Sequence, residues 1–328
     1  MHHSRIVLGV LLVSMFAEFA GAPGNTASAG SLTPPGPPSP TMKPLDQVEA
    51  RTPISSLPFT ISAAGSYYLT QNLNYTGSGN GITVNAGPTT IDLNGFTLSG
   101  GAFGNGGITG NQDYAVKNGF ISSWNSGISS ISGTQQLESV TVRSCRSTGA
   151  VVGDATVTDS SFLFNTQYGI YVIGVASITG TRAGGNGVFG VYLGPRGLVD
   201  NCILDGNGNG FASGGIHMGP SGTIRHSVVT ANNGAGIEFT DHTLLSENNI
   251  FNNVGSGIVS AGGDGSRIEG NSTNSNSGYG IDSNSGGNFI TRNSARSNSL
   301  GAFRITGSGN VAPVEFSTIT NPASNLSY

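Results

Sequence analysis

Glycine followed by an apolar residue recurs along the chain at a spacing of 20 to 25 residues. The recurring glycines are Gly107, Gly127, Gly149, Gly169, Gly190, Gly215, Gly236, Gly257, Gly280 and Gly301. Eight of the ten residues that follow them are isoleucine or valine, which favour strands. A repeat of this length indicates a solenoid, in which each coil buries its apolar side chains against the next coil.

Two further apolar rows keep the same spacing, so each coil is predicted to hold three short strands. One row is Leu137, Val157, Ile178, Leu198, Ile224, Leu245, Ile268 and Ile290. The other is Val142, Phe162, Ala183, Ile203, Val229, Ile250, Thr273 and Ala295. Turns rich in Gly, Asn and Ser separate the rows. The pattern predicts an all-β, right-handed parallel β-helix of ten to eleven coils of about 21 residues, spanning residues 59–310 with an N-terminal cap.

Two other repeat folds fit the pattern less well. A leucine-rich repeat needs regular leucines and often a helix, whereas leucine is sparse here and no helical period is present. A calcium-binding β-roll needs repeated G-G-x-G-x-D units, and residues 261–265 resemble half of one such unit without recurring.

Asparagine also follows the repeat. Five asparagines lie four residues before a repeat glycine: Asn165, Asn186, Asn232, Asn253 and Asn276. Stacked amides can satisfy one another inside a solenoid, and an unpaired buried amide would be costly, so a structural ladder is predicted. Cys145 holds the same position one coil earlier, and Asn248 and Asn271 begin a second ladder.

The ends of the chain depart from the repeat. An apolar run over residues 6–16, followed by small residues, predicts a signal peptide at 1–29 and therefore secretion to the cell exterior, cell surface or periplasm. After processing, no membrane span is expected. Residues 30–58 are rich in proline and are predicted to form a semi-rigid linker, and residues 311–328 form a C-terminal tail outside the repeat. Cys145 and Cys202, about three coils apart, are expected to be free thiols.

Charge narrows the range of partners. Charged residues make up 9% of the chain and the formal net charge is -4, so there is no basic surface for nucleic acid. No cofactor is predicted, and Ca²⁺ lacks an obvious set of carboxylate ligands.

The early strands carry a family resemblance. They include Gly65-Ser66-Tyr67-Tyr68-Leu69, Gly81-Ile82-Thr83-Val84 and the segment from Ile91 to Leu98. Together with the Gly-Ile repeat and the asparagine ladders, they resemble secreted β-helix proteins of the pectin-lyase-like superfamily, of the NosD-like carbohydrate-binding-and-sugar-hydrolase type. The resemblance implies a parallel β-helix, in a superfamily that includes polysaccharide lyases, hydrolases, epimerases, tailspikes and adhesins. The motifs of its polygalacturonases are missing here, and Phe239-Thr240-Asp241-His242 matches a pectate lyase motif only superficially.

Side chains alternate along a strand, so the residue after each inward apolar position should point outward. This outward row is Thr109, Ser129, Val151, Tyr171, Tyr192, His217, Glu238, Val259, Asp282 and Phe303. Its middle predicts a site: Tyr171 and Tyr192 could stack on sugar rings, and His217 with Glu238 could transfer protons. Arg196 and Arg182, in turns, could reach a uronate carboxylate, and Asp241 and His242 are further candidates for substrate binding in a turn.

A second set of charged residues, Asp200, His226 and Glu247, should also lie on successive coils. It is interpreted as a solvated charged edge. Taken together, the residues predict a secreted protein that binds an extracellular polysaccharide or cell-surface glycan and processes it as a lyase, epimerase or glycoside hydrolase. The alternative is a non-catalytic scaffold for structure or adhesion at the cell surface.

Overall fold

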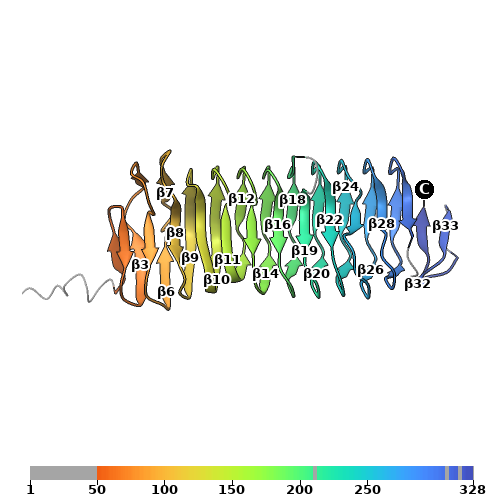
Figure 1. Ribbon diagram of the computed structural model, residues 1–328, viewed down its shortest axis with the longest axis horizontal. Helices are drawn as coiled ribbons and strands as arrows, with labels where there is room; N and C mark the ends of the chain where they lie inside the picture. The colour runs from red at the N-terminus through yellow and green to blue at the C-terminus, as the bar shows by residue number, and fades with distance from the viewer. Residues whose placement is uncertain (1–49, 210–212, 307–309, 317–319, 328) are drawn as a thin grey trace, which may run out of the picture. The chain divides into compact units, whose positions relative to one another are not determined.

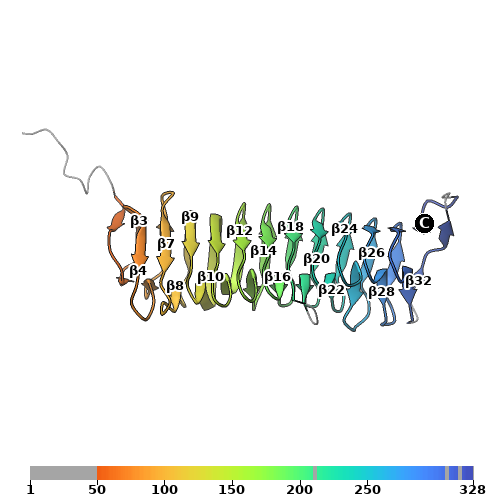
Figure 2. The ribbon, with the colours of Figure 1, turned by 90° about the horizontal axis from the view of Figure 1, so that it is seen from above.

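The computed structural model describes residues 50–209, 213–306, 310–316 and 320–327. The predicted signal peptide and most of the predicted linker lie outside these residues. Within them, every paired strand is parallel and no helix is present, so the chain forms a parallel β-solenoid whose coils stack along one axis (Figures 1 and 2).

Each coil contributes to three columns of strands. The first column consists of β2 (Phe59–Ile61), β5 (Ile82–Val84), β8 (Gly106–Gly110), β10 (Ser126–Arg143), β11 (Ala150–Thr158), β13 (Ile170–Val172), β16 (Phe189–Leu193), β19 (Gly214–Met218), β22 (Ala235–Phe239), β25 (Ile258–Ser260), β28 (Tyr279–Ser283) and β31 (Gly301–Ile305). These are twelve coils in the described residues, slightly more than the ten to eleven predicted.

The other two columns follow the first around the coil. The second holds β1 (Thr52–Ile54), β3 (Gly65–Leu69), β6 (Thr89–Asp92), β9 (Tyr114–Ser122), parts of β10 and β11, β14 (Ala176–Thr179), β17 (Leu198–Asp200), β20 (Thr223–Arg225), β23 (Leu244–Ser246), β26 (Arg267–Glu269), β29 (Phe289–Thr291) and β32 (Asn310–Val311). The third holds β4 (Leu73–Tyr75), β7 (Thr97–Gly100), parts of β9 and β10, β12 (Ser161–Leu163), β15 (Arg182–Gly184), β18 (Ile203–Asp205), β21 (Val228–Thr230), β24 (Asn249–Phe251), β27 (Ser272–Asn274), β30 (Ser294–Arg296) and β34 (Asn325–Ser327), which also pairs with β33 (Val314–Phe316).

The solenoid extends beyond both predicted boundaries. Strand β1 begins at Thr52, inside the segment predicted as linker, and pairs with β3. In the predicted tail, β34 pairs with β30, so the tail covers an edge that would otherwise stay open. The N-terminal extension was not predicted, because residues 52–58 contain none of the repeat glycines, whereas a tail that covers the edge of the last coil is what the sequence led us to expect.

The core is a set of aliphatic columns inside the tube. Ile170, Val191, Ile216 and Ile237 are successive members of one column, and each is fully buried. Burying such a side chain contributes roughly 1.5–3 kcal/mol before conformational entropy is subtracted. Stability therefore accumulates at each interface between neighbouring coils.

One coil was predicted one residue out of register. Val199 and Leu204 are fully buried and pair with Ile178 and Ala183, whereas Leu198 and Ile203, predicted to point inward, do not. Ile203 is in fact exposed. In a strand, a one-residue shift moves a side chain to the opposite face, so the choice of the wrong apolar residue reversed both assignments.

The asparagines form a continuous ladder inside one corner of the tube. The Oδ1 atom of each accepts from the backbone N–H and the Nδ2 of the asparagine one coil earlier, at 2.9–3.1 Å, along Asn165, Asn186, Asn207, Asn232, Asn253, Asn276 and Asn298. Asn207 and Asn298 were not predicted, because neither lies four residues before a repeat glycine. At the ladder's start, the Cys145 N–H donates to Asn165 Oδ1.

A second ladder occupies another corner. It runs from Asn248 through Asn271 and Asn293 to Asn325, again with each Oδ1 accepting from the preceding coil. In earlier coils smaller polar groups take its place, among them Thr181 and Ser227, and Cys202 holds the position between them. The two cysteines therefore lie in different corners. Both are buried and free, and burial raises the pKa of each thiol to about 11.

The ladders explain why glycine recurs. A Cβ atom on Gly169 would lie 2.4 Å from the Gly190 carbonyl oxygen and 2.8 Å from Asn186 Nδ2. Real Cβ atoms do not approach other atoms so closely, so only glycine fits beside the ladder. The glycine spacing and the asparagine spacing are thus two signs of one packing requirement.

Candidate functional site

One outward row of side chains runs along the face formed by the first column of strands. This first-strand face presents Thr83, Thr109, Ser129, Val151, Tyr171, Tyr192, His217, Glu238, Val259, Asp282 and Arg304 in register. Phe303, predicted for the last position, aligns instead with the inward Ile281. The last coil is one residue longer than the glycine spacing suggests, because Gly301 pairs with Tyr279 and not with Gly280.

The middle of this face is a continuous stack, which we call the aromatic strip: Tyr171, Tyr192, His217 and Glu238. The rings of Tyr171 and Tyr192 have centroids 4.9 Å apart at an interplanar angle of 20°. The Tyr192 ring and the His217 imidazole are nearly parallel, at 10° and 4.2 Å. The next contact is a hydrogen bond of 2.9 Å between His217 Nδ1 and Glu238 Oε1. The structure thus brings all four predicted residues together.

Two more aromatic residues support the strip. Tyr168 lies with its ring centroid 5.3 Å from that of Tyr171 and 5.5 Å from that of Tyr192. Phe189 is almost fully buried and contacts Tyr192 and His217 edge-on, at 5.8 and 5.7 Å. Both come directly before a repeat glycine in successive coils, which is the sequence signal that would have identified them. They limit the tilt of the rings that face outward.

The His217–Glu238 pair has a defined chemistry. An ionised carboxylate only accepts hydrogen bonds, so the hydrogen of the shared contact belongs to Nδ1 of the imidazole. Nε2 is then left available to exchange a proton or to bind a ligand hydroxyl. The side chains are 15% and 25% exposed, so the pair is partly shielded from water but still accessible.

The hydroxyls of Tyr168 and Tyr192 have raised pKa values. Partial burial, and then the neighbouring Tyr171, raise the pKa of Tyr192, with smaller effects from Tyr168 and Glu238. Burial and Tyr171 likewise raise the pKa of Tyr168. Both groups therefore offer O–H donors at neutral pH, next to flat apolar ring faces.

The other predicted binding residues lie at a neighbouring corner, between the first and second columns. Arg196 comes four residues after Tyr192, and His242 four residues after Glu238; both have left-handed backbone angles, with φ of 60° and 53°. Asp241 Oδ1 accepts a hydrogen bond from the Asp264 backbone N–H at 3.0 Å, so this side chain shapes a turn. No hydrogen bond, ion pair or ring contact joins the corner residues to the aromatic strip in the described part of the chain.

Arg182 was also predicted to reach the strip, and this prediction is wrong. It belongs to β15 in the third column, and its guanidinium binds both carboxylate oxygens of Asp205, at 2.9 and 2.7 Å. Strand β15 pairs with β18, which places Arg182 on another face of the tube.

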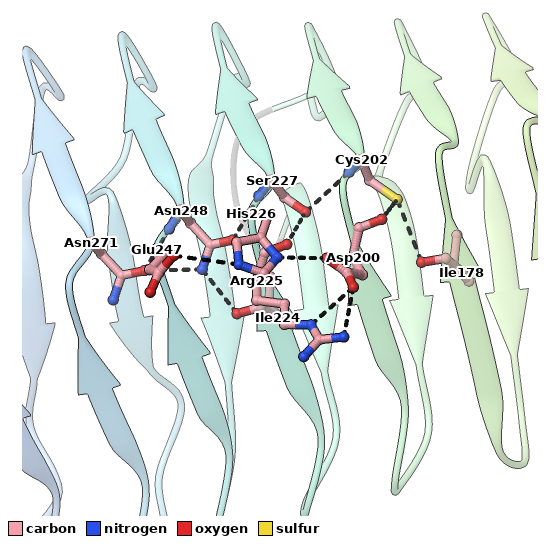
Figure 3. A network of polar contacts seen from close by, with 10 residues as sticks. All are labelled: Ile178, Asp200, Cys202, Ile224, Arg225, His226, Ser227, Glu247, Asn248 and Asn271. Carbon is pink, nitrogen blue, oxygen red and sulfur yellow. Dashed lines mark hydrogen bonds and ion pairs between the residues drawn. The ribbon is translucent and has the colours of Figure 1, made fainter.

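The second set of charged residues does come together, at the corner between the second and third columns (Figure 3). Asp200 accepts from His226 Nδ1 and from Arg225 Nε, both at 2.9 Å, and His226 Nε2 lies 3.4 Å from Glu247. We call these four residues the charged ridge. The hydrogen bond from His226, together with Arg225, lowers the pKa of Asp200. These contacts connect side chains from three successive coils.

Because the folded-state pKa of Asp200 is lowered, its ionised form stabilises the folded state above the ordinary pKa of an aspartate. That contribution is lost as pH falls through the folded-state pKa. We expect Asp200→Asn to reduce the free energy of unfolding at neutral pH, and we expect this difference from the wild type to shrink as pH falls below about 4, the ordinary pKa of an aspartate. Urea unfolding of both proteins over a series of pH values from neutral to acidic measures the difference. Glu138→Gln, at an exposed carboxylate on β10, is the control; a gap between wild type and Asp200→Asn that stays constant with pH would contradict the expectation.

A polar depression lies on the same first-strand face, towards the N-terminal coils. It has a volume of about 710 Å³ and is lined by Asn80, Thr83, Asn85, Thr109, Asn111, Gln112 and Ser129, together with apolar neighbours. Asn80 Oδ1 and Asn111 Oδ1 accept from the backbone N–H groups of Gly106 and Ile131, which orients these amides. Metal-ligating clusters of three or more side chains are not found among the described residues.

Comparison with known proteins identifies the family to which this fold belongs. Residues 107–271, half of the chain, match the family described as a right-handed β-helix region. The chain belongs to the right-handed β-helix family. No curated protein sequence matches this β-helix protein.

Three solved structures share its fold at low sequence identity. A mutant of the periplasmic alginate epimerase AlgG aligns with a TM-score of 0.52 and 16% identity, over 75% of each chain. The A-module of the mannuronan C-5 epimerase AlgE4 from Azotobacter vinelandii aligns with a TM-score of 0.52 and 14% identity, over 81% of this β-helix protein and 91% of the module. ORF18 of Geobacillus virus E2 aligns equally well at 14% identity, and there this chain spans 49% of the viral protein's length. At these identities the likeness concerns the fold alone.

Proposed function

We propose that this β-helix protein is secreted and binds an extracellular polysaccharide along the first-strand face, with the aromatic strip as its centre. The observation that carries the proposal is the stack of Tyr171, Tyr192 and His217, ending in the hydrogen bond to Glu238. Flat rings with polar edges suit sugars, whose C–H groups pack on aromatic faces and whose hydroxyls need donors and acceptors.

The spacing of the strip supports a polymeric ligand. Successive coils lie about 4.8 Å apart, so residues on neighbouring coils can meet successive parts of one extended chain. Two of the solved structures with this fold are epimerases that are named for alginate and for mannuronan. They support a glycan ligand as a class and do not select a sugar.

The experiment is a binding panel with the full chain. Isothermal titration calorimetry against soluble neutral and acidic polysaccharides should give a saturable signal with at least one of them. Binding should be competed by oligosaccharides of the same sugar. A chain that binds no member of a broad panel would overturn the proposal and favour the alternative of a scaffold without a glycan ligand.

A second candidate function is catalysis at the bound sugar, and the His217–Glu238 pair is the observation that favours it. A carboxylate that fixes Nδ1–H leaves Nε2 to act as a base or acid, the arrangement that general acid–base catalysis uses. Incubation with each ligand, followed by detection of unsaturated ends, reducing ends or C5-inverted residues, distinguishes lyase, hydrolase and epimerase activity. Loss of product in His217→Ala would support the assignment, and unchanged product would contradict it.

A further inference from the structure

The charged side chains in the middle and at the C-terminal end of the first-strand face are paired with one another. Glu238 holds His217, and Asp282 on the same face holds the guanidinium of Arg304, with its Oδ1 accepting from Nε at 2.7 Å. Between Thr83 and Tyr171 the face carries only hydroxyls and a valine. A ligand that lies between Thr83 and Glu238 therefore meets hydroxyls, a valine, tyrosine rings and the hydrogen-bonded His217–Glu238 pair.

Away from this face, four arginines of nearby coils form ion pairs with carboxylates. Arg182 binds Asp205, Arg225 binds Asp200, and both Arg267 and Arg292 bind Glu269. Arg196 is exposed at the corner, four residues beyond Tyr192 along the chain, and one arginine at the edge of the face does not form a row of cations. A polyuronate carries a carboxylate on every sugar and needs a row of cations to offset their desolvation.

The polar depression adds matching neutral chemistry. Its amides, from Asn80, Asn85, Asn111 and Gln112, and its hydroxyls, from Thr83 and Ser129, can both donate and accept, as sugar hydroxyls do. Ser129 pairs with Val151, and Val151 pairs with Tyr171, so the depression and the aromatic strip are two coil steps apart on one surface. At about 4.8 Å per step, one extended oligosaccharide spans both.

We propose that the ligand of the first-strand face is an uncharged glycan that runs parallel to the solenoid axis, from the polar depression across Val151 onto the aromatic strip. This inference rests on the proposed function and names the ligand class of that site. A consequence follows for chemistry at His217: an uncharged glycan has no carboxyl group to acidify the neighbouring C–H, so hydrolysis is favoured over elimination or epimerisation.

The first test compares neutral and acidic polymers of similar length. The full chain is titrated with soluble mannan, glucan and galactan, and with alginate and polygalacturonate. At least one neutral polymer should bind about tenfold or more tightly than either polyuronate. Equal or tighter binding of a polyuronate would overturn the inference while leaving the proposed function intact. Absence of binding to every polymer would count against the proposed function itself.

A charge variant makes the test independent of the choice of polymer. Val151→Lys places a cation on the first-strand face, and Thr156→Lys places one on the second column of the same strand, β11. Val151→Lys should create or strengthen polyuronate binding and should not strengthen neutral glycan binding, whereas Thr156→Lys should change neither. If the wild type already binds polyuronate and Val151→Lys adds nothing, the face is not neutral in function and the inference fails.

The extent of the site is tested by ligand length. Ser129→Leu removes a hydroxyl and narrows the depression, and Ser177→Leu makes the same change on β14 in the second column. Ser129→Leu should weaken the binding of a long neutral glycan about tenfold. It should not change the affinity for an oligosaccharide that covers only the aromatic strip. Equal losses for long and short ligands, or none for either, would contradict an occupied depression.

Discussion

Tyr192→Ala is expected to weaken glycan binding about tenfold or more, equivalent to about 1.4 kcal/mol or more of binding free energy. Tyr192 is the central ring of the strip, since it stacks on both Tyr171 and His217. Its removal deletes one sugar-stacking surface and also frees the two neighbouring rings to tilt. Titration calorimetry with the best ligand of the panel measures the loss.

Two variants make the result interpretable. Tyr192→Phe keeps the ring and removes the hydroxyl, so it should retain most of the affinity if stacking dominates. Phe120→Ala removes an exposed aromatic side chain from the third column and should bind like the wild type. Because Tyr192 points outward, Tyr192→Ala should lose only about 1 kcal/mol of stability. Undiminished binding by a folded Tyr192→Ala protein would remove the aromatic strip from the site.

Asn232→Ala is expected to destabilise the fold by about 3–5 kcal/mol. Asn232 is fully buried, and its Oδ1 accepts two hydrogen bonds of 2.9 Å from Asn207, one from the backbone N–H and one from Nδ2. Its own Nδ2 donates to the Leu204 carbonyl and to Asn253. Alanine leaves these groups buried without this partner, and each such group costs about 1–3 kcal/mol.

The neighbouring Asn233 provides the matched control, because it is exposed and outside the ladder. Asn233→Ala should change stability by less than about 0.5 kcal/mol. Urea unfolding gives the free energies, and hydrogen exchange at the Asn207 amide should accelerate most in Asn232→Ala, since coils in a solenoid interact mainly with their neighbours. Similar stabilities for the two variants would show that the ladder contributes little.

Most of the solenoid could be predicted from the sequence because two kinds of residue, the inward aliphatics and the glycines beside the ladder, repeat with the same period. Ile170 and Ile216 recur since each coil needs an inward aliphatic, and Gly169 recurs since the ladder amide of Asn186 fills the space of a Cβ atom. Errors arose where the coil length changes. Because 25 residues separate Gly190 from Gly215, Asn207 does not lie four residues before a repeat glycine and was not predicted. The last coil is one residue longer than the glycine spacing indicates, so Phe303 was predicted to point outward although it aligns with an inward residue.

The candidate site was predictable in part for the same reason. Strand alternation placed Tyr171, Tyr192, His217 and Glu238 on one face, and register alone brings them side by side. Corner residues such as Arg196 and Asp241 could not be positioned in this way, because a turn has no fixed period. Arg182 was assigned to a turn, although it directly precedes the inward Ala183 and belongs to a strand of the third column.

By itself, the sequence determined the stacking of coils, the inward columns and the composition of the outward row, because a periodic backbone converts residue spacing directly into position. Only the tertiary structure decided the rest: the parallel rings of Tyr192 and His217, the hydrogen bond between His217 and Glu238, and the ion pair between Asp282 and Arg304. Those features depend on side-chain rotamers between neighbouring coils, which spacing does not encode. They determine whether the face offers a sugar apolar rings and hydroxyls or a row of free charges.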